Sequence, residues 1–265
     1  MKSSRLKNIV IVILLLVNAF LLFLLLSRRA EQRAAYDRSV EQLVTLYETS
    51  GVSLDPAILA PNSTLLSAAL DRDAAQEAAF AEALLGSADM SDSGGGVCLY
   101  SGEYGLCSIR ANGAVEASLS RPVDDPEAFS HDLFEAFGYE CTHTQLSDGG
   151  GSISGVRSAS AHPVFNASLT LSFSGGSLTA VSGIFLSALT EGRRTDGIDA
   201  VTALVRFLDY RSASGIVCTQ VLAVDDGYLL QSSATVPLRL LPVWRITTDV
   251  NIFYVNCKTG EISRG

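Results

Sequence analysis

The stretch IVIVILLLVNAFLLFLLL, from Ile9 to Leu26, contains no charged side chain. As an α-helix it would be about 27 Å long, close to the roughly 30 Å of a bilayer's hydrocarbon core. No small-residue cleavage site follows, because Leu26 leads directly into Ser27-Arg28-Arg29, so a retained anchor is favoured over a cleaved signal peptide. The sequence therefore predicts a single-pass membrane protein with a transmembrane helix at 9–26.

Basic residues flank the apolar run equally on its two sides: Lys2, Arg5 and Lys7 before it, and Arg28, Arg29 and Arg33 after it. With equal numbers of basic residues on the two sides, the positive-inside rule alone gives no orientation, and the positive charge of the free α-amino group favours a cytoplasmic N-terminus. We expect a short basic cytoplasmic tail at 1–8, a juxtamembrane helix at 27–50 and a C-terminal domain on the extracytoplasmic side of the cell membrane.

Asn18 is the polar residue in the middle of the apolar run. Its amide has no water to bind there, so it favours a hydrogen bond to another transmembrane helix, although a bond to its own backbone is the alternative. Leucines at helical spacing extend the same face: Leu14, Leu15, Leu21, Leu22 and Leu25. This stripe is the predicted helix–helix contact.

The formal charge of the chain is −9, but it is unevenly distributed. Six of the 19 basic residues and one of the 28 acidic residues flank the apolar run, which leaves −14 for the rest. Such an acidic domain is repelled by phosphate backbones and anionic headgroups, so nucleic acid is an unexpected partner and the bilayer is contacted only near the anchor.

Hydrophobic periodicity predicts an α+β fold, with the N-terminal transmembrane helix followed by a two-lobed domain of helix-plus-antiparallel-sheet repeats. The segments are a first helix and sheet at 51–122, a helix with an antiparallel meander at 123–190, and a second such unit at 191–265. Helices are expected at Asp71–Leu85, Asp125–Phe137 and Gly197–Tyr210. Ser174-Gly175-Gly176 and Asp225-Asp226-Gly227 are expected to be hairpin turns, because glycine allows positive φ.

Catalytic patterns are weak in this sequence. Cys141 and His143 would share a face if they lie on a strand, but no orienting third group is evident. His131 and Glu135 are one helical turn apart and could share a metal, although two such residues are more often a solvated face. We therefore expect a protein that is not an enzyme and needs no cofactor or metal.

The five cysteines allow a disulfide. If the intervening turn centres on Gly102-Glu103, Cys98 and Cys107 lie opposite each other on a hairpin and could be bridged. Cys218 and Cys257 could also pair, which would leave Cys141 over. Buried free thiols are the alternative, because cysteine packs as a small hydrophobe.

Both ends of the chain resemble the YycI (WalI) family of two-component-system regulatory proteins. At the start, the resemblance lies in Arg5 to Asn8 and the apolar run with its Asn18; at the end, it lies in Pro242 to Ile246, Phe253 to Asn256 and Thr259 to Ile262. The C-terminal stretch is also similar to the closing hairpin of PepSY-type modules.

The YycI resemblance implies a regulator that sits in the membrane beside a sensor histidine kinase and a YycH-like single-pass protein, and that modulates kinase output in cell-wall homeostasis. The PepSY resemblance implies the alternative, an inhibitory or ligand-binding domain acting on a peptidase or cell-wall fragment. Trp244 and Arg245 are the candidate interaction residues of the last hairpin, as either interface or lobe core; for Trp244 the core is favoured, because a single Trp in a strand usually packs.

Overall fold

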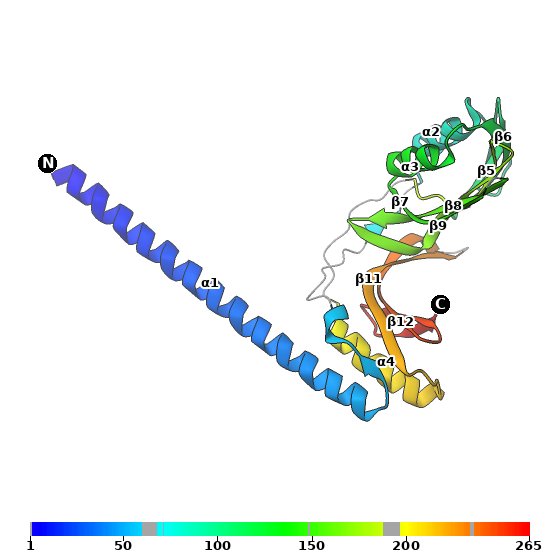
Figure 1. Cartoon of the computed structure of the whole chain (residues 1–265). Coiled ribbons are helices and arrows are strands. Elements are labelled where there is room, and N and C mark those ends of the chain that lie inside the picture. Colours follow the sequence, from blue (N-terminus) through cyan, green and yellow to red (C-terminus); the bar gives the residue numbers. More distant parts are fainter. Residues whose placement is uncertain (1, 60–67, 71, 148, 188–196, 234–235) are drawn as a thin grey trace.

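The computed structural model describes residues 2–59, 68–70, 72–147, 149–187, 197–233 and 236–265. It contains one long N-terminal helix and a domain of two sheet-based lobes, called here the upper and lower lobes after their positions in Figure 1. The predicted α+β class is confirmed.

Helix α1 runs without a break from Lys2 to Thr49, so the predicted transmembrane and juxtamembrane helices form one element. Its apolar part projects away from both lobes (Figure 1) and, from Ile13 on, the helix is long and apolar enough to cross a membrane. Its C-terminal end is different, because Leu43 and Tyr47 are buried against the lower lobe. The chain thus has one N-terminal helix suited to a single-pass anchor, and that helix continues into the domain.

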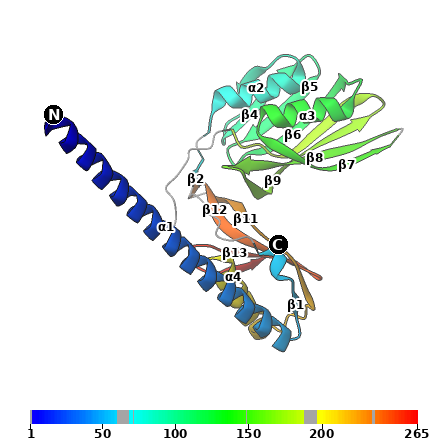
Figure 2. The same cartoon turned by 60° about the vertical axis from the view of Figure 1, so that its left-hand side comes forward.

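The upper lobe is an antiparallel sheet with helices α2 (Ala74–Leu85) and α3 (Pro126–Ala136) side by side on one face (Figure 2). The spatial order of its strands is β3-β4-β5-β6-β10-β9-β8-β7. The strands are β3 (Asp89–Asp92), β4 (Val97–Gly102), β5 (Gly105–Arg110), β6 (Ala114–Pro122), β7 (Tyr139–Ser147), β8 (Gly150–Ala159), β9 (His162–Ser174) and β10 (Ser177–Ile184).

Side-chain caps explain where the upper-lobe helices begin. Asp73 accepts hydrogen bonds from the backbone N–H groups at the start of α2, and Asp125 does the same for α3, whose first residue is Pro126. Between helices and sheet, the rings of Phe80 and Phe185 stack with centroids 4.2 Å apart. This apolar layer is the core of the upper lobe.

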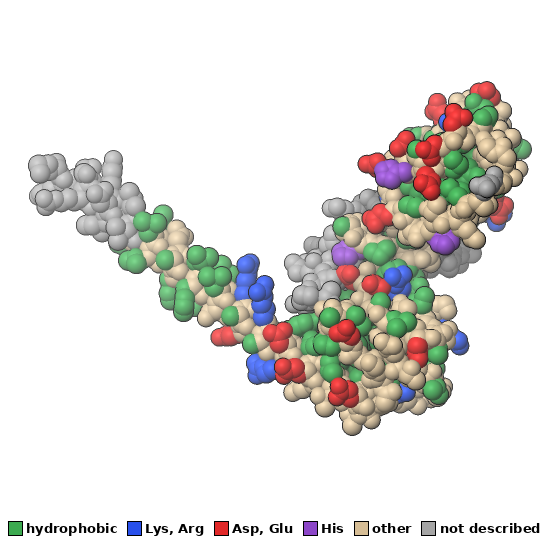
Figure 3. Space-filling view, in the orientation of Figure 1, with side chains coloured by type: hydrophobic (Ala, Val, Ile, Leu, Met, Phe, Trp, Pro, Cys, Tyr) green, Lys and Arg blue, Asp and Glu red, His purple; other side chains and the backbone are tan. Residues whose placement is uncertain are grey.

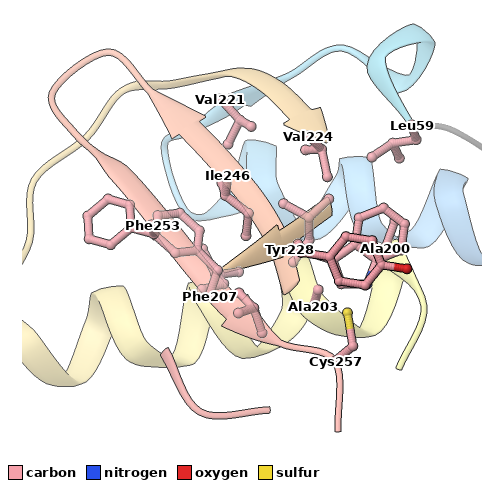
Figure 4. Close-up of a cluster of buried hydrophobic side chains, with 14 of the residues drawn as sticks. Leu59, Ala200, Ala203, Phe207, Val221, Val224, Tyr228, Ile246, Phe253 and Cys257 are labelled. Atoms are coloured by element: carbon pink, nitrogen blue, oxygen red, sulfur yellow. The ribbon is translucent and has the colours of Figure 1, made fainter. Parts of the chain in front are cut away.

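The lower lobe is a smaller sheet covered on one face by helix α4 (Ala200–Ser214) and by the end of α1. Its antiparallel strands are β11 (Gln220–Ser233), β12 (Val236–Thr248), β13 (Ile252–Asn256) and β14 (Ile262–Arg264), joined by the short β1 (Ser53–Leu54) and β2 (Ala68–Ala69), with the 3-10 helix η1 (Pro56–Ile58) nearby. Figure 4 shows Phe207 of α4 facing Phe253 and Ile246 of the sheet in the buried core. Residues between 43 and 59, Leu70 and residues between 198 and 257 therefore share one core, which Ala159, Val164, Ala167 and Leu186 also enter.

The two lobes are joined where β9 reaches β11. Only Tyr228 and Val164 pair there, in parallel, and Val164 is fully buried in the lower core. The side chain of Asn166 extends this contact, because it accepts from Leu230 N–H and donates to Leu230 C=O, at 2.7 and 3.0 Å. The backbone pairing at the junction is thus narrow, and the Asn166 side-chain amide reinforces it.

The two predicted hairpin turns have different outcomes. The turn predicted at Asp225-Asp226-Gly227 is wrong, because β11 passes straight through these residues. Gly227 has no positive φ; a side chain there would meet the Pro163 carbonyl oxygen, 2.5 Å from a built Cβ, so the glycine allows the lobes to approach. The hairpin turn at Ser174-Gly175-Gly176 is confirmed, with φ of 57° and 75° at the two glycines.

Candidate functional site

A groove lies on the face of the lower sheet that α4 does not cover. It has a volume of about 450 Å³ and combines an apolar floor with polar groups, which is the usual make-up of a ligand site. The lining residues come from four strands and the β13–β14 turn: Leu229, Gln231, Leu241, Val243, Tyr254, Asn256, Glu261, Ile262 and Ser263. This groove is the candidate binding site.

One end of the groove abuts the junction between the lobes. The ring of Tyr254 lies 5.8 Å from that of Phe165 on β9, and partial burial raises the pKa of the Tyr254 hydroxyl although Arg245 opposes the shift. The Arg245 guanidinium lies 4.3 Å from the centre of the Phe165 ring and donates to the Asp225 carboxylate at 2.7 Å. A ligand in the groove would therefore touch Tyr254, whose ring packs against Phe165 at the junction.

An ionic contact between β9 and β11 crosses the junction on the other face of the lower sheet. His162 Nδ1 lies 3.1 Å from Asp226 Oδ2, and both side chains are largely buried. The pair is an ion pair when the imidazole is protonated. Together with Arg245 and Phe165, it links β9 to the lower sheet on both of its faces.

The two expected hairpin residues, Trp244 and Arg245, point to opposite faces. Trp244 is 2% exposed, and its indole N–H donates to the Ile198 carbonyl at 2.9 Å, so it is a core residue and not an interface residue. Arg245 lies beside the groove, half-buried. The alternation of strand residues separates the two roles.

The Asn18 stripe is exposed along α1. Its leucines have exposed fractions between 51% and 63%: Leu14, Leu15, Leu21, Leu22 and Leu25. Asn18 itself is exposed in the same helix. The stripe is available to another helix, and its role as a contact stays a prediction.

The pairing expected for Cys98 and Cys107, directly opposite each other on a hairpin, is wrong. The turn residues are Glu103 and Tyr104, so Cys98 lies opposite Ile109 and Cys107 opposite Tyr100. The two cysteines are diagonal neighbours, a separation of about 7–8 Å that is too long for a disulfide. All five cysteines are free thiols in the structure, including Cys218 and Cys257.

The other candidate pairs do not form a reactive centre. A β-bulge between Cys141 and His143 aligns them with the consecutive residues Gly155 and Ser154, so their side chains point to opposite faces. His131 Nδ1 lies 3.8 Å from Glu135 Oε2 on the exposed face of α3. Within the described part of the chain, no group of three or more His, Cys, Asp or Glu side chains could hold a metal.

Sequence reasoning did not identify the groove. Its floor residues Leu229, Leu241 and Ile262 look like ordinary strand residues, and they line one groove only because β11, β12, β13 and β14 lie in this order in one sheet. One feature of the sequence could have indicated the groove. Strands β11 and β12 carry apolar residues on both faces, whereas a sheet that is covered on one face needs them only on that face.

Comparisons with known proteins give a limited result. No family model and no curated protein matches the chain. Among solved structures, it is similar to the C-terminal domain of YpeB from Bacillus megaterium, with a TM-score of 0.38 and 11% identity over 74% of this chain and 98% of that one. It is also similar to an uncharacterized protein from Eubacterium rectale ATCC 33656, with a TM-score of 0.45 and 10% identity over 81% and 88% of the two chains. At these identities no residue role carries over.

Proposed function

We propose that this chain is a single-pass membrane protein that binds a neighbouring protein and regulates it, and that it does not itself catalyse a reaction. The observation that carries the proposal is the continuity of α1, which runs from the apolar span into the core of the lower lobe. Because Leu43 and Tyr47 are buried there, the lobe and the membrane helix move together. A ligand that favours one orientation of the lobe would favour one orientation of the helix.

The partner we propose is a sensor histidine kinase, accompanied by a YycH-like single-pass protein. Support comes from the resemblance of both chain ends to YycI and from the exposed Asn18 stripe. The regulator would act by binding one kinase conformation better than the other. We place the N-terminus in the cytoplasm and the two lobes outside it.

Alanine insertions in the exposed part of α1 test this coupling. Two alanines between Ala34 and Ala35 turn the lobes by about 200° relative to the membrane helix, whereas seven restore the original direction to within about 20°. A photocrosslinker at Leu22 would identify the contacted membrane protein, and phosphorylation of the response regulator would report kinase output.

We expect two alanines to abolish regulation and seven to preserve it. Equal output with both insertions would exclude coupling through the helix. A wild-type chain that crosslinks to no sensor kinase would exclude the proposed partner.

The groove favours a second candidate, a PepSY-like domain that binds a peptidase or a cell-wall fragment. Its volume and its apolar floor suit a side chain or small group of a ligand. Leu241→Glu would place a charge in the groove, and Leu106→Glu, at an exposed position of the upper lobe, is the matched control. Binding of a soluble peptidoglycan digest or inhibition of a secreted peptidase should be lost only with Leu241→Glu; equal loss or no loss in the two variants would exclude the groove.

A further inference from the structure

A second pocket opens between α3 and β7 in the upper lobe, at the edge of the sheet. It has a volume of about 360 Å³. Helix α3 supplies Glu127, Ala128, Ser130 and His131, strand β7 supplies Cys141 and Thr144, and Ile153 of β8 lies beneath. Because β7 is the last strand of the sheet, no further element of the described chain covers this side.

Ser130 is the buried polar group of this pocket. It is 1% exposed, and its hydroxyl has no hydrogen-bond partner among the described residues. A buried hydroxyl without a partner is costly, so a polar atom of a ligand in the pocket would relieve that cost.

Cys141 is the exposed member of the five cysteines, all of which the structure describes. Cys107, Cys218 and Cys257 are buried, and Cys98 is half-buried. The Cys141 sulfur lies 3.7 Å from the Thr144 hydroxyl, at the mouth of the same pocket. Thiol–disulfide exchange requires access to the attacking sulfur, so this residue is the one placed to react.

The charges around the pocket determine which kind of thiol compound would bind beside Cys141. Glu127 lines it, and α3 carries Asp132 and Glu135 but neither lysine nor arginine. The rest of the domain is strongly acidic as well. A cationic group is therefore attracted to the pocket and an anionic one is repelled.

We propose that Cys141 and this pocket form a modification site, at which a small cationic aminothiol is held as a mixed disulfide. The Cys141 thiolate attacks one sulfur of the symmetrical disulfide of the aminothiol. The disulfide's S–S bond breaks, the Cys141–sulfur bond forms, and the other half leaves as a thiolate that takes up the proton released by Cys141. The ammonium group then lies near Glu127, and Ser130 gains a polar neighbour.

The test uses the full chain in detergent micelles with cystamine, the disulfide of cysteamine, and with the anionic 3,3′-dithiodipropionic acid. Intact mass and peptide mapping follow the modified fraction of each cysteine. We expect Cys141 to be modified first and cystamine to react faster than the anionic disulfide. Ser130→Ala should lower the equilibrium amount of the cystamine adduct by about fivefold, the effect of one ordinary hydrogen bond.

Glu127→Gln and Glu140→Gln form the matched pair. Both remove one negative charge near Cys141, but Glu140 does not line the pocket and instead accepts a hydrogen bond from Ser158 at 2.7 Å. We expect only Glu127→Gln to weaken the adduct. Equal adduct levels in the wild type, Ser130→Ala and Glu127→Gln would show an accessible thiol without a site, and modification of Cys98 before Cys141 would also overturn the proposal.

Discussion

The Tyr47 hydroxyl donates a hydrogen bond to the backbone carbonyl of Leu204 at 2.8 Å, and this contact ties the end of α1 to the middle of α4. The two residues are 157 positions apart. Burial raises the pKa of the Tyr47 hydroxyl, so the group stays a donor throughout the physiological range. The bond fixes the rotation of the membrane helix relative to the lower lobe.

Replacing Tyr47 tests how much this contact stabilises the lower lobe. Tyr47→Phe keeps the ring and removes the hydrogen bond, so we expect the free energy of unfolding to fall by about 1 kcal/mol. Tyr47→Ala also removes the buried ring and should cost about 3–5 kcal/mol. Urea unfolding of the detergent-solubilised chain measures both, and equal losses in the two variants would show that the ring itself contributes nothing.

Gly227 tests the bridge between the lobes. A Cβ there would lie 2.5 Å from the Pro163 carbonyl oxygen and 2.7 Å from the Phe165 ring, so Gly227→Ala should destabilise the protein by about 1–3 kcal/mol. Gly149→Ala is the control, because a Cβ at that position meets nothing within 4 Å. The prediction fails if thermal unfolding of the two variants is the same.

The buried thiols predict a loss of stability at high pH. Burial raises the pKa of Cys107 and of Cys257 from the ordinary 9.0 to about 12. Between these values the two thiols ionise in the unfolded chain but not in the folded one. The stability that this difference provides is therefore complete below pH 9 and is lost as the pH rises to 12. Cys107→Ala with Cys257→Ala should make the decline shallower, leaving the part due to buried tyrosines such as Tyr139 and Tyr100.

Asn18 tests the predicted contact in the membrane. Asn18→Leu removes a hydrogen bond of about 1 kcal/mol, so co-purification with a partner membrane protein should fall severalfold while the two lobes stay folded. Phe20→Leu, about 200° around the helix and also exposed, should have no effect. Unchanged recovery with Asn18→Leu would count against a transmembrane contact at this residue.

Local chemistry explains which elements could be predicted from the sequence. Asp125 with Pro126 and Gly138 mark the two ends of α3, and Gly175-Gly176 mark a hairpin, because their preferences act within a few residues. The predicted turn at Asp225 to Gly227 failed because the glycine meets β9, a contact set by tertiary structure. Such a requirement has no local signature.

Strand β7 shows a different limit. It was not predicted because its side chains from Glu140 to Gln145 are exposed, so no alternation of apolar and polar residues marks it. Because β7 was not predicted, the pocket beside Cys141, which lies between α3 and this edge strand, was not predicted either. A shift of one residue in the turn, from Gly102-Glu103 to Glu103-Tyr104, changes the cross-strand register by two residues and was also enough to align the wrong cysteines.

The lower lobe is assembled from two separated parts of the chain, and this sets an order of events during synthesis. Residues 72–187 form a contiguous stretch that can pair its own strands as soon as it leaves the ribosome. The apolar face of α1 around Leu43 and Tyr47 has to wait for α4, which supplies Leu204, and for strands β11 to β14, which complete the same core. A nascent chain halted before residue 200 would hold a finished upper lobe beside an uncovered helix end, the kind of surface that chaperones bind.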